Sequence, residues 1–421
     1  MRLKQIIGGA LVCGTTATFA AHPEVSDVSI SQARGVVEVA YTLSGASAVV
    51  TVDFQTNATE NVWASIGEQN FTALDGDVNR LVDTGSRKIV WKKVKKSWPG
   101  HKIGEGGFRA VVKAWDRAQP PKWMTVDIAS GAIRYYVSDK ALPGGFSCDE
   151  YKLTKVLMRR IEAAGNTFQM GYGPSDNGSN VSTEDPHFVT FTNDYYMAVY
   201  ETTQRQFENM YRLVDPDYVY NGAFAEAGGK RPASAGGKLT YAELRGPGSE
   251  VRWPQDGMQV GANSVFAKLR QKTVDGIFDL PTEAQWEFAC RAGTQTDYNT
   301  GYNYSQGEAG VDAFSWNKNN ANNVTHNVGE LVPNAWDLYD MHGNVMEFCR
   351  DVYSDHLGSA HQIDPVGPVS EGSGEPVHIA RGGSYLYNLV NLRSARRVGE
   401  YAYSNYGFRL WADGTAVYGS R

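Results

Sequence analysis

The sequence lacks a long internal apolar run, an excess of positive charge and a large set of cysteines. After the first residues, no stretch approaches the about 20 apolar residues of a membrane-spanning helix, so we expect no transmembrane segment. The formal net charge is -6, so no overall positive field draws the chain to nucleic acid. The histidines and cysteines show no zinc or iron spacing, and no phosphate-binding glycine loop or Ser-His-Asp order appears.

Residues 1–21 have the pattern of a secretory signal peptide. Arg2 and Lys4 precede a short apolar run, and Ala20 and Ala21 mark the expected cleavage site. We therefore expect the mature protein to be secreted, periplasmic or on the cell surface. Of the four cysteines, Cys13 is removed with this peptide, and the odd remainder allows at most one internal disulfide in an oxidising compartment.

Residues 22–118 alternate apolar and polar side chains with a period of two, as the strands of a small all-β domain do. The apolar positions of the first such run are Val37, Val39, Tyr41 and Leu43. We predict a β-sandwich of the immunoglobulin or fibronectin kind. Residues 119–150 carry Pro and Gly clusters and read as a linker that contains one hairpin.

From residue 151 the pattern changes to long loops with two helices. Thr203 with Gln206, and Thr282 with Gln285, have the spacing of capping boxes, and each pair is followed by apolar residues at helical spacing. In the second helix, Trp286, Ala289, Cys290 and Gly293 form one stripe. We expect this domain to extend over residues 151–413, with a short tail at 414–421.

Four motifs in order carry a family resemblance. They are LPTEAQWEFACRAGT (280–294), PNAWDLYDMHGNVMEFCRD (333–351), RGGS (381–384) and NYGFRL (405–410). The chain resembles the sulfatase-modifying factor family, whose founding activity is formylglycine generation. The resemblance implies an α+β, loop-rich fold of the C-type lectin kind, and a leading β-sandwich is common in secreted bacterial proteins of this group.

The resemblance also implies a calcium site in the turn DLYDMHGNVMEF. The matching ligands are the side chains of Asp340 and Glu347 and the carbonyl groups of Gly343 and Val345, oxygen ligands of the kind that calcium prefers. The alternative is that Asp340 and Glu347 cap turns or pair with arginines. His342, inside the turn, is expected to be a hydrogen-bonding residue and not a metal ligand.

The family's two copper-binding thiols are absent at the positions that match them. Tyr387 stands three residues after Ser384, where the first thiol is expected; the second position falls near Asn391 or Leu392, and Met346 replaces a family tryptophan. Because phenol and amide groups cannot replace thiolates as copper(I) ligands, we do not expect copper. Cys290 and Cys349 are expected to form a disulfide or to remain as two packed thiols.

The C-terminal segment is instead rich in Tyr, Asn and Arg, a composition typical of recognition surfaces. Its predicted ligand-binding residues are Ser384, Tyr385, Tyr387, Asn388, Asn391, Arg396 and Tyr403. The alternative is that part of the set packs inward, with Arg393 and Arg396 clamping acidic side chains. We therefore expect a non-catalytic binding or accessory protein for a peptide, protein or glycan. The alternative is an oxidoreductase of the formylglycine-generating family that acts on protein cysteine.

Overall fold

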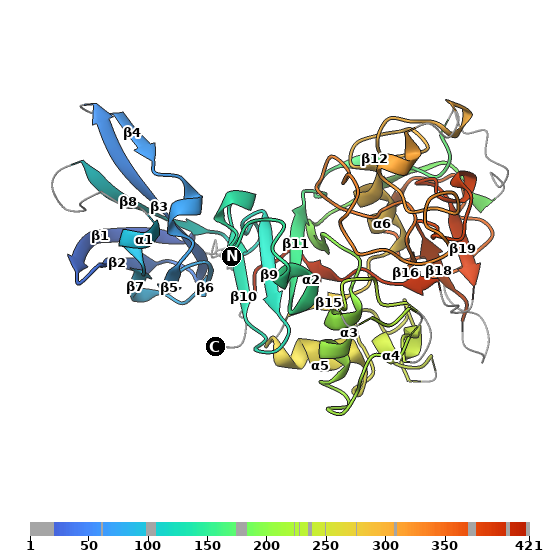
Figure 1. Cartoon of the computed structure of the whole chain (residues 1–421), viewed down its shortest axis with the longest axis horizontal. Coiled ribbons are helices and arrows are strands. Elements are labelled where there is room, and N and C mark those ends of the chain that lie inside the picture. The colour runs from blue at the N-terminus through green and yellow to red at the C-terminus, as the bar shows by residue number, and fades with distance from the viewer. Residues whose placement is uncertain are drawn as a thin grey trace, which may run out of the picture.

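The structure is a computed structural model that shows an N-terminal β unit joined to a larger domain (Figure 1). It describes residues 21–59, 62–97, 107–173, 183–222, 224–226, 228–234, 238–248, 250–274, 276–306, 310–368, 376–400 and 405–417. The predicted signal peptide lies outside these residues, apart from Ala21. No described helix combines the length and the apolar character needed to span a membrane.

The N-terminal unit contains two sheets whose inner faces share one apolar core. One sheet has the order β1 (Glu24–Ala33), β2 (Val36–Ser44), β7 (Gly85–Trp91) and β5 (Leu74–Gly76). The other has the order β4 (Val62–Ser65), β3 (Ala48–Thr59) and β6 (Arg80–Val82), and β8 (Phe108–Trp115) also pairs with β3. The alternation predicted from Val37, Val39, Tyr41 and Leu43 is confirmed, because all four side chains are buried on one face of β2. The finer immunoglobulin-like or fibronectin-like assignment stays a prediction.

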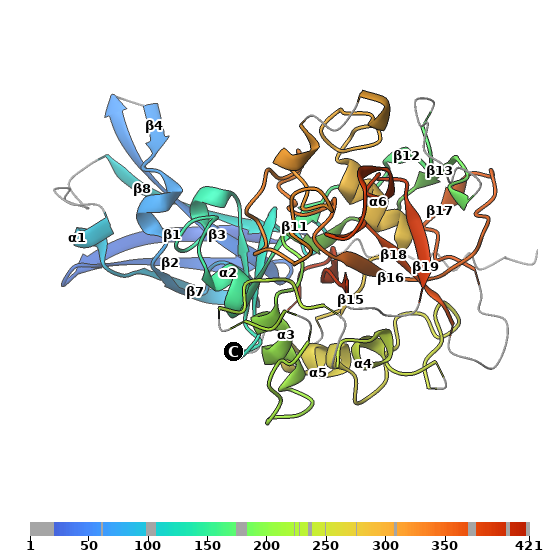
Figure 2. The same cartoon turned by 45° about the vertical axis from the view of Figure 1, so that its right-hand side comes forward.

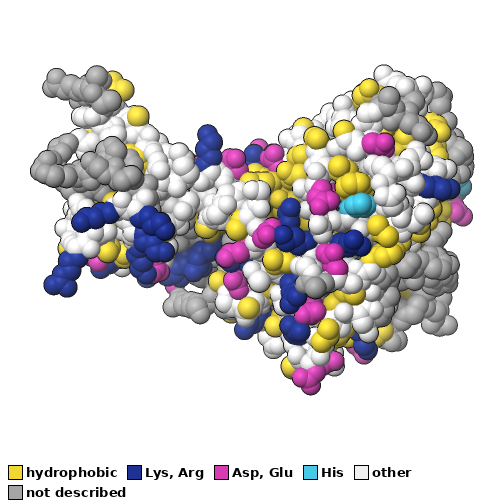
Figure 3. Space-filling model, viewed as in Figure 1, with side chains coloured by type: hydrophobic (Ala, Val, Ile, Leu, Met, Phe, Trp, Pro, Cys, Tyr) yellow, Lys and Arg dark blue, Asp and Glu magenta, His cyan; other side chains and the backbone are white. Residues whose placement is uncertain are grey.

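Two short helices, η1 (Glu68–Phe71) and α1 (Val94–Ser97), lie in the connections of this unit. Figure 3 shows Lys and Arg side chains gathered on its surface, whereas positive and negative side chains are mixed on the larger domain.

The larger domain is built on a six-stranded sheet. Its order is β10 (Ile133–Tyr136), β9 (Trp123–Asp127), β11 (Lys155–Ile161), β14 (Tyr195–Ala198), β21 (Trp411–Asp413) and β15 (Phe278–Asp279). The hairpin expected within residues 119–150 is present as β9 and β10. It is more than a linker, because β9 pairs with β11 over Lys155–Arg159 and so belongs to the sheet of the larger domain.

Five described helices of four or more residues accompany the sheet. They are α2 (Glu150–Leu153), α3 (Gln204–Tyr211), α4 (Tyr241–Arg245), α5 (Val265–Lys272) and α6 (Glu283–Arg291), with the short helices η2 (Asp139–Ala141), η4 (Tyr304–Gln306), η5 (Val311–Ala313) and η6 (Leu389–Asn391). Both predicted capping boxes are formed, at the starts of α3 and α6. The prediction of only two helices is wrong. The helix α5 was missed because its N-cap, Ser264, has no capping-box partner that would mark the start of a helix in the sequence. Gly293 is exposed and lies outside the buried stripe of α6.

Two smaller sheets complete the domain. One has the order β12 (Thr167–Met170), β13 (His187–Thr190) and β17 (Gln362–Ile363); the other has the order β19 (Arg397–Glu400), β18 (His378–Arg381), β16 (Met346–Val352) and β20 (Tyr406–Gly407). Figure 2 shows β16, β18 and β19 beside α6. The second sheet therefore places three of the family motifs against the helix that carries the fourth.

The N-terminal unit packs against the six-stranded sheet. Val49 and Leu81 belong to the same buried cluster as Met124 and Tyr135 of the hairpin, and the Tyr135 amide donates a hydrogen bond to the carbonyl oxygen of Asn79 at 2.7 Å. The described part of the tail returns to this junction, where the Val417 amide donates to the Tyr135 hydroxyl at 3.0 Å.

Candidate functional site

The loop after β18 begins with a turn that requires glycine. Gly382 and Gly383 have φ angles of +89° and +70°, and a Cβ atom on Gly383 would lie 2.7 Å from the carbonyl oxygen of Asn391. Residues 384–396 follow, and β19 then returns antiparallel beside β18. The loop is therefore held at both ends by one strand pair.

The structure separates the predicted ligand-binding residues into internal and accessible ones. Ser384 and Tyr385 are buried; the Ser384 hydroxyl accepts a hydrogen bond from the Asn405 amide at 3.1 Å, and Tyr385 packs edge-on against the ring of Phe224. These two side chains are therefore parts of the interior and do not form an outer contact surface. Tyr387, Asn391 and Arg396 are half-buried, Asn388 is exposed, and Tyr403 lies outside the described residues.

Tyr387, at the position that matches the first family thiol, packs between two apolar clusters. One cluster includes Met346 and the core of the domain, and the other contains Tyr298 and Leu389 beneath the loop. Met346 is buried, and its sulfur lies 3.9 Å from the Asn405 amide nitrogen. An aromatic ring and a thioether therefore fill the region that the resemblance assigns to thiol chemistry.

Cys290 and Cys349 are both free and buried, so the predicted disulfide between them is wrong in this structure and the alternative of two packed thiols holds. Cys290 points toward the turn of His342 and toward Ser394, with sulfur contacts of 3.8 and 3.7 Å, whereas Cys349 lies on β16 near the carbonyl of Glu347. Burial raises the pKa of Cys290 to about 12 and that of Cys349 well above its usual value. Neither thiol is poised to ionise near neutral pH.

The turn assigned to calcium is organised by an ion pair. Both carboxylate oxygens of Glu347 accept hydrogen bonds from Arg409, at 2.7 to 3.2 Å, and one also accepts from the Trp286 indole at 2.7 Å. Asp340 accepts from the Gly329 amide at 2.7 Å. The alternative in which Asp340 and Glu347 cap a turn and pair with an arginine is the arrangement found.

Glu201 is a third carboxyl group at this turn, and sequence reasoning missed it. Its oxygens accept hydrogen bonds from the Val345 amide at 3.0 Å and from the Asn344 side chain at 2.7 Å. Burial, followed by the charges of Asp340 and Glu347, raises the pKa of Glu201 well above its usual value. Glu201 precedes the capping box of α3 with no motif of its own, so only the fold reveals its partners.

The residues as placed do not fit a calcium ion well. Calcium needs several oxygen ligands free to converge on it, and Arg409 already occupies both oxygens of Glu347. Among the residues that the structure describes, no group of three His, Cys, Asp or Glu side chains is arranged to hold a metal ion. Calcium binding at Asp340, Gly343, Val345 and Glu347 therefore stays a prediction.

Buried arginines tie the loop after β18 to the rest of the domain through ion pairs. Arg393 makes two hydrogen bonds to Glu184, at 2.8 and 2.9 Å, and Arg397 makes two to Glu283, at 2.7 and 2.8 Å. All four side chains are buried. The alternative in which Arg393 clamps an acidic side chain internally is thus confirmed.

His342 is a hydrogen-bonding residue of the turn, as predicted. Its Nδ1 lies 2.6 Å from the carbonyl oxygen of Leu392, and its Nε2 accepts from the Asn299 amide at 3.2 Å. Burial lowers the pKa of His342 to about 4, so the ring is neutral at physiological pH. It ties the turn before β16 to the C-terminal loop.

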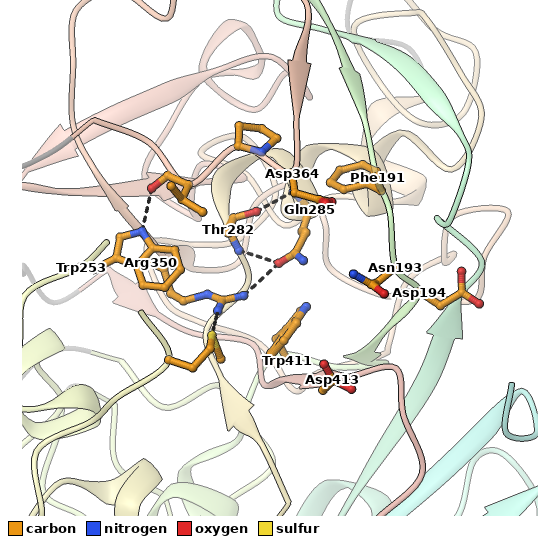
Figure 4. Close-up of a pocket in the computed structure, with 13 residues that line it drawn as sticks. Phe191, Asn193, Asp194, Trp253, Thr282, Gln285, Arg350, Asp364, Trp411 and Asp413 are labelled. Carbon is orange, nitrogen blue, oxygen red and sulfur yellow. Dashed lines mark hydrogen bonds between the residues drawn. The ribbon is translucent and has the colours of Figure 1, made fainter. Parts of the chain in front are cut away.

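A separate open cavity of about 250 Å³ lies at the edge of the six-stranded sheet (Figure 4). Its walls come from six segments: the one before β14, the one between α4 and α5, the start of α6, β16, the one after β17, and β21. Figure 4 shows Arg350, Gln285, Asn193 and Trp411 around its centre. None of the predicted site residues within the described ranges lines this cavity. The cavity brings together segments that are far apart in the sequence and share no motif.

Comparison with known proteins finds one matching family and several similar proteins. Residues 154–413 match the family described as "Sulfatase-modifying factor enzyme 1-like domain". Among solved structures, the Treponema denticola variable protein 1 has a TM-score of 0.45 and 24% sequence identity, and the similarity covers 62% of this chain and 96% of that one.

Two curated relatives are formylglycine-generating enzymes. The enzyme of Mus musculus is 28% identical over 165 residues, which are 32% of this chain and 39% of that protein. The enzyme of Streptomyces coelicolor is 32% identical over 121 residues, 25% of this chain and 36% of that protein. The chain thus spans well under half the length of these relatives. Because the family match covers more than half of the chain, this protein belongs to the sulfatase-modifying factor enzyme 1-like family.

Proposed function

We propose that this protein is an exported, non-catalytic binding or accessory protein, whose family domain binds a peptide, protein or glycan through the loop after β18. The observation that carries the proposal is the ring of Tyr387 at the position that matches the first family thiol, between two apolar clusters. The domain's own thiols, Cys290 and Cys349, are buried and have raised pKa values. Thiol-based copper chemistry has no accessible thiolate there.

The accessible part of the loop supports recognition. Asn388 is exposed, and Tyr387, Asn391 and Arg396 are half-buried, so one aromatic ring, two amides and a guanidinium share one short segment. The segment is supported by buried ion pairs, which hold it in one conformation before a ligand arrives. A preformed surface loses less conformational entropy on binding than a flexible one.

The relatives named as formylglycine-generating enzymes favour one alternative, oxidation of a protein cysteine. We would incubate the full chain with copper(I), oxygen and a cysteine-containing sulfatase-motif peptide, and measure aldehyde with a hydrazide probe. We expect no aldehyde. Turnover would replace the binding proposal with an oxidase.

Binding itself is tested on peptide and glycan arrays with the variant Tyr387→Ala. We expect the variant to lose the signal, while Phe188→Ala, which removes an exposed ring on β13 of the same domain, keeps it. An equal signal from wild type and Tyr387→Ala would exclude the loop as the binding surface.

A further inference from the structure

The cavity of Figure 4 is lined by buried hydrogen-bond donors that have no partner in the protein. Trp411 is 6% exposed and Arg350 is 2% exposed, yet the indole nitrogen of the first and the Nε of the second make no hydrogen bond. Figure 4 shows the Trp411 nitrogen directed toward the space between Arg350, Gln285 and Asn193. Buried donors are almost always paired because leaving one without an acceptor destabilises the protein, so two of them at one cavity indicate a missing acceptor.

These donors are fixed in position by stacking. The guanidinium of Arg350 lies between two indole rings, 4.8 Å from the ring centre of Trp253 and 4.3 Å from that of Trp411. The Trp253 nitrogen donates to the carbonyl oxygen of Val366 at 2.7 Å, which ties this stack to the segment after β17. The cavity wall is therefore rigid before any ligand enters.

Gln285 adds a further donor because its carbonyl oxygen is already used. That oxygen accepts from the Thr282 amide at 2.9 Å, within the capping box, and from Arg350 at 3.1 Å. Both lone pairs are thereby engaged, and Figure 4 shows the amide nitrogen on the opposite side, toward Asn193. The capping box that starts α6 thus also presents an NH₂ group to the cavity.

Hydrogen-bond acceptors also line the cavity. Asp194, Asp364 and Asp413 line the cavity, and each already accepts hydrogen bonds from the protein. Asp194 accepts from Arg160 and from the Ala164 amide at 2.8 Å, Asp364 from the Thr192 amide at 3.0 Å and the Thr192 hydroxyl, and Asp413 from the Thr415 amide at 2.8 Å. An ionised carboxylate has about four lone-pair sites, so Asp413 keeps the most acceptor capacity of the three and Asp194 the least. With Arg350 in the wall and Arg160 beside it, the cavity favours neither a free anion nor a free cation.

We propose that this cavity binds one ring of a neutral sugar. Hydroxyl groups donate and accept at once, so neighbouring hydroxyls of one ring can accept from Trp411 and Gln285 and donate to Asp413. The volume of about 250 Å³ is below the about 300–1,000 Å³ of drug-sized ligand pockets, which suits a single ring. Ile363 and Val366 are 64% and 39% exposed beside it and offer an apolar rim to a second ring of a glycan.

The test is ligand-observed NMR titration of the full chain with a panel of methyl glycopyranosides. We expect at least one to bind, and Trp411→Phe, which keeps a ring but removes the N–H, to weaken that binding about tenfold, the equivalent of one hydrogen bond. Gln285→Glu is a second variant; glutamate also serves in a capping box, so the helix start is kept while the donor is lost. Phe188→Ala is the matched control and should bind as wild type does.

Two results would overturn the proposal. One is no glycoside binding, whether or not a peptide is bound instead; the other is equal affinity in wild type, Trp411→Phe and Gln285→Glu. The Tyr387→Ala variant separates this cavity from the loop after β18, because it should leave glycoside binding here unchanged. Failure of the loop proposal and failure of the cavity proposal are therefore distinguishable.

Discussion

The N-terminal unit and the family domain bury different kinds of side chain. The shared core of the two N-terminal sheets consists of apolar residues, and the ion pair of Lys88 with Glu38 lies on the surface, with exposed fractions of 53% and 44%. In the family domain, Arg381, Arg393, Arg397 and Arg409 are each at most 2% exposed, and each pairs with a buried glutamate.

The difference follows from where the backbone hydrogen bonds are made. Strands satisfy their own amides and carbonyls in ladders, but buried loops need other partners. Arg409 donates to the carbonyl oxygens of Ala198 and Val199, both at 2.9 Å, and to that of Tyr339 at 2.7 Å, while it pairs with Glu347. A guanidinium with five donors can thus join three chain segments, which explains how a loop-rich domain keeps one conformation.

The largest expected effect comes from removing this arginine. Arg409→Met leaves Glu347 buried without its counter-ion and three carbonyl groups with lost bonds, so we expect a loss of about 3–5 kcal/mol in the free energy of unfolding. Urea titration followed by circular dichroism measures it. The double variant Arg409→Met, Glu347→Gln should recover part of the loss, because the uncompensated charge is gone. A loss below about 1 kcal/mol in the single variant would show that the pair is not structural.

A smaller and pH-dependent effect is expected at the start of α6. Burial, with the charge of Glu283 adding to it, raises the pKa of Asp351 to about 7, while its side chain accepts a hydrogen bond from the Glu283 amide at 2.8 Å. A raised folded-state pKa means that the ionised form is disfavoured on folding, so the cost is present above pH 7 and is relieved as the pH falls. Asp351→Asn keeps an acceptor and removes the charge.

We therefore expect Asp351→Asn to be more stable than wild type at pH 8, with an advantage that shrinks by about 1.4 kcal/mol between pH 8 and pH 6. The two proteins are compared by urea unfolding at each pH. The comparison is needed because burial lowers the pKa of His342 and of His378 to about 4, and these groups destabilise wild type and variant alike as the pH falls below 6.5. A constant difference between the two proteins would contradict the assignment.

Local features of this chain were predictable from sequence, and distant partners were not. The capping boxes of Thr203 and Thr282 depend on residues three positions apart, and the alternation in residues 36–44 depends on neighbours. Glu201 lies 143 residues from its partner Asn344, and Glu184 lies 209 residues from Arg393. No spacing rule connects such pairs; only the packing of the sheets brings them together.

The family motifs predicted the turn before β16 and the loop after β18, but not which side chains in them are buried or what those side chains bind. Glu347 stands where the resemblance implies a metal ligand, yet the fold delivers Arg409 from the last motif to the same carboxylate. Ser384 and Tyr385 directly follow the glycine turn and are buried, although the composition of the segment predicted a ligand-binding role for them. The residues that line the cavity of Figure 4 come from six segments of the chain, so no single sequence motif predicts it.

The response to calcium tests whether Arg409 is the partner of Glu347 in the turn before β16. If Arg409 is the counter-ion of Glu347, that carboxylate is not available to calcium, and we expect chelation or added calcium to change the unfolding midpoint by less than about 2 °C, which is under 1 kcal/mol. Differential scanning calorimetry of the full chain measures it. A calcium-dependent rise of several degrees would instead restore the predicted site at Asp340 and Glu347 and would require Arg409 to move.

The smallest effect is expected in the N-terminal unit. Lys88 and Glu38 lie 2.6 Å apart on adjacent strands, but both are largely exposed, so water and salt screen their attraction. Lys88→Ala should therefore change the free energy of unfolding by less than about 0.5 kcal/mol, compared by urea titration at low and at high salt. A loss comparable to that of Arg409→Met would erase the contrast between the two regions, because an exposed pair would then matter as much as a buried one that also binds three carbonyl groups.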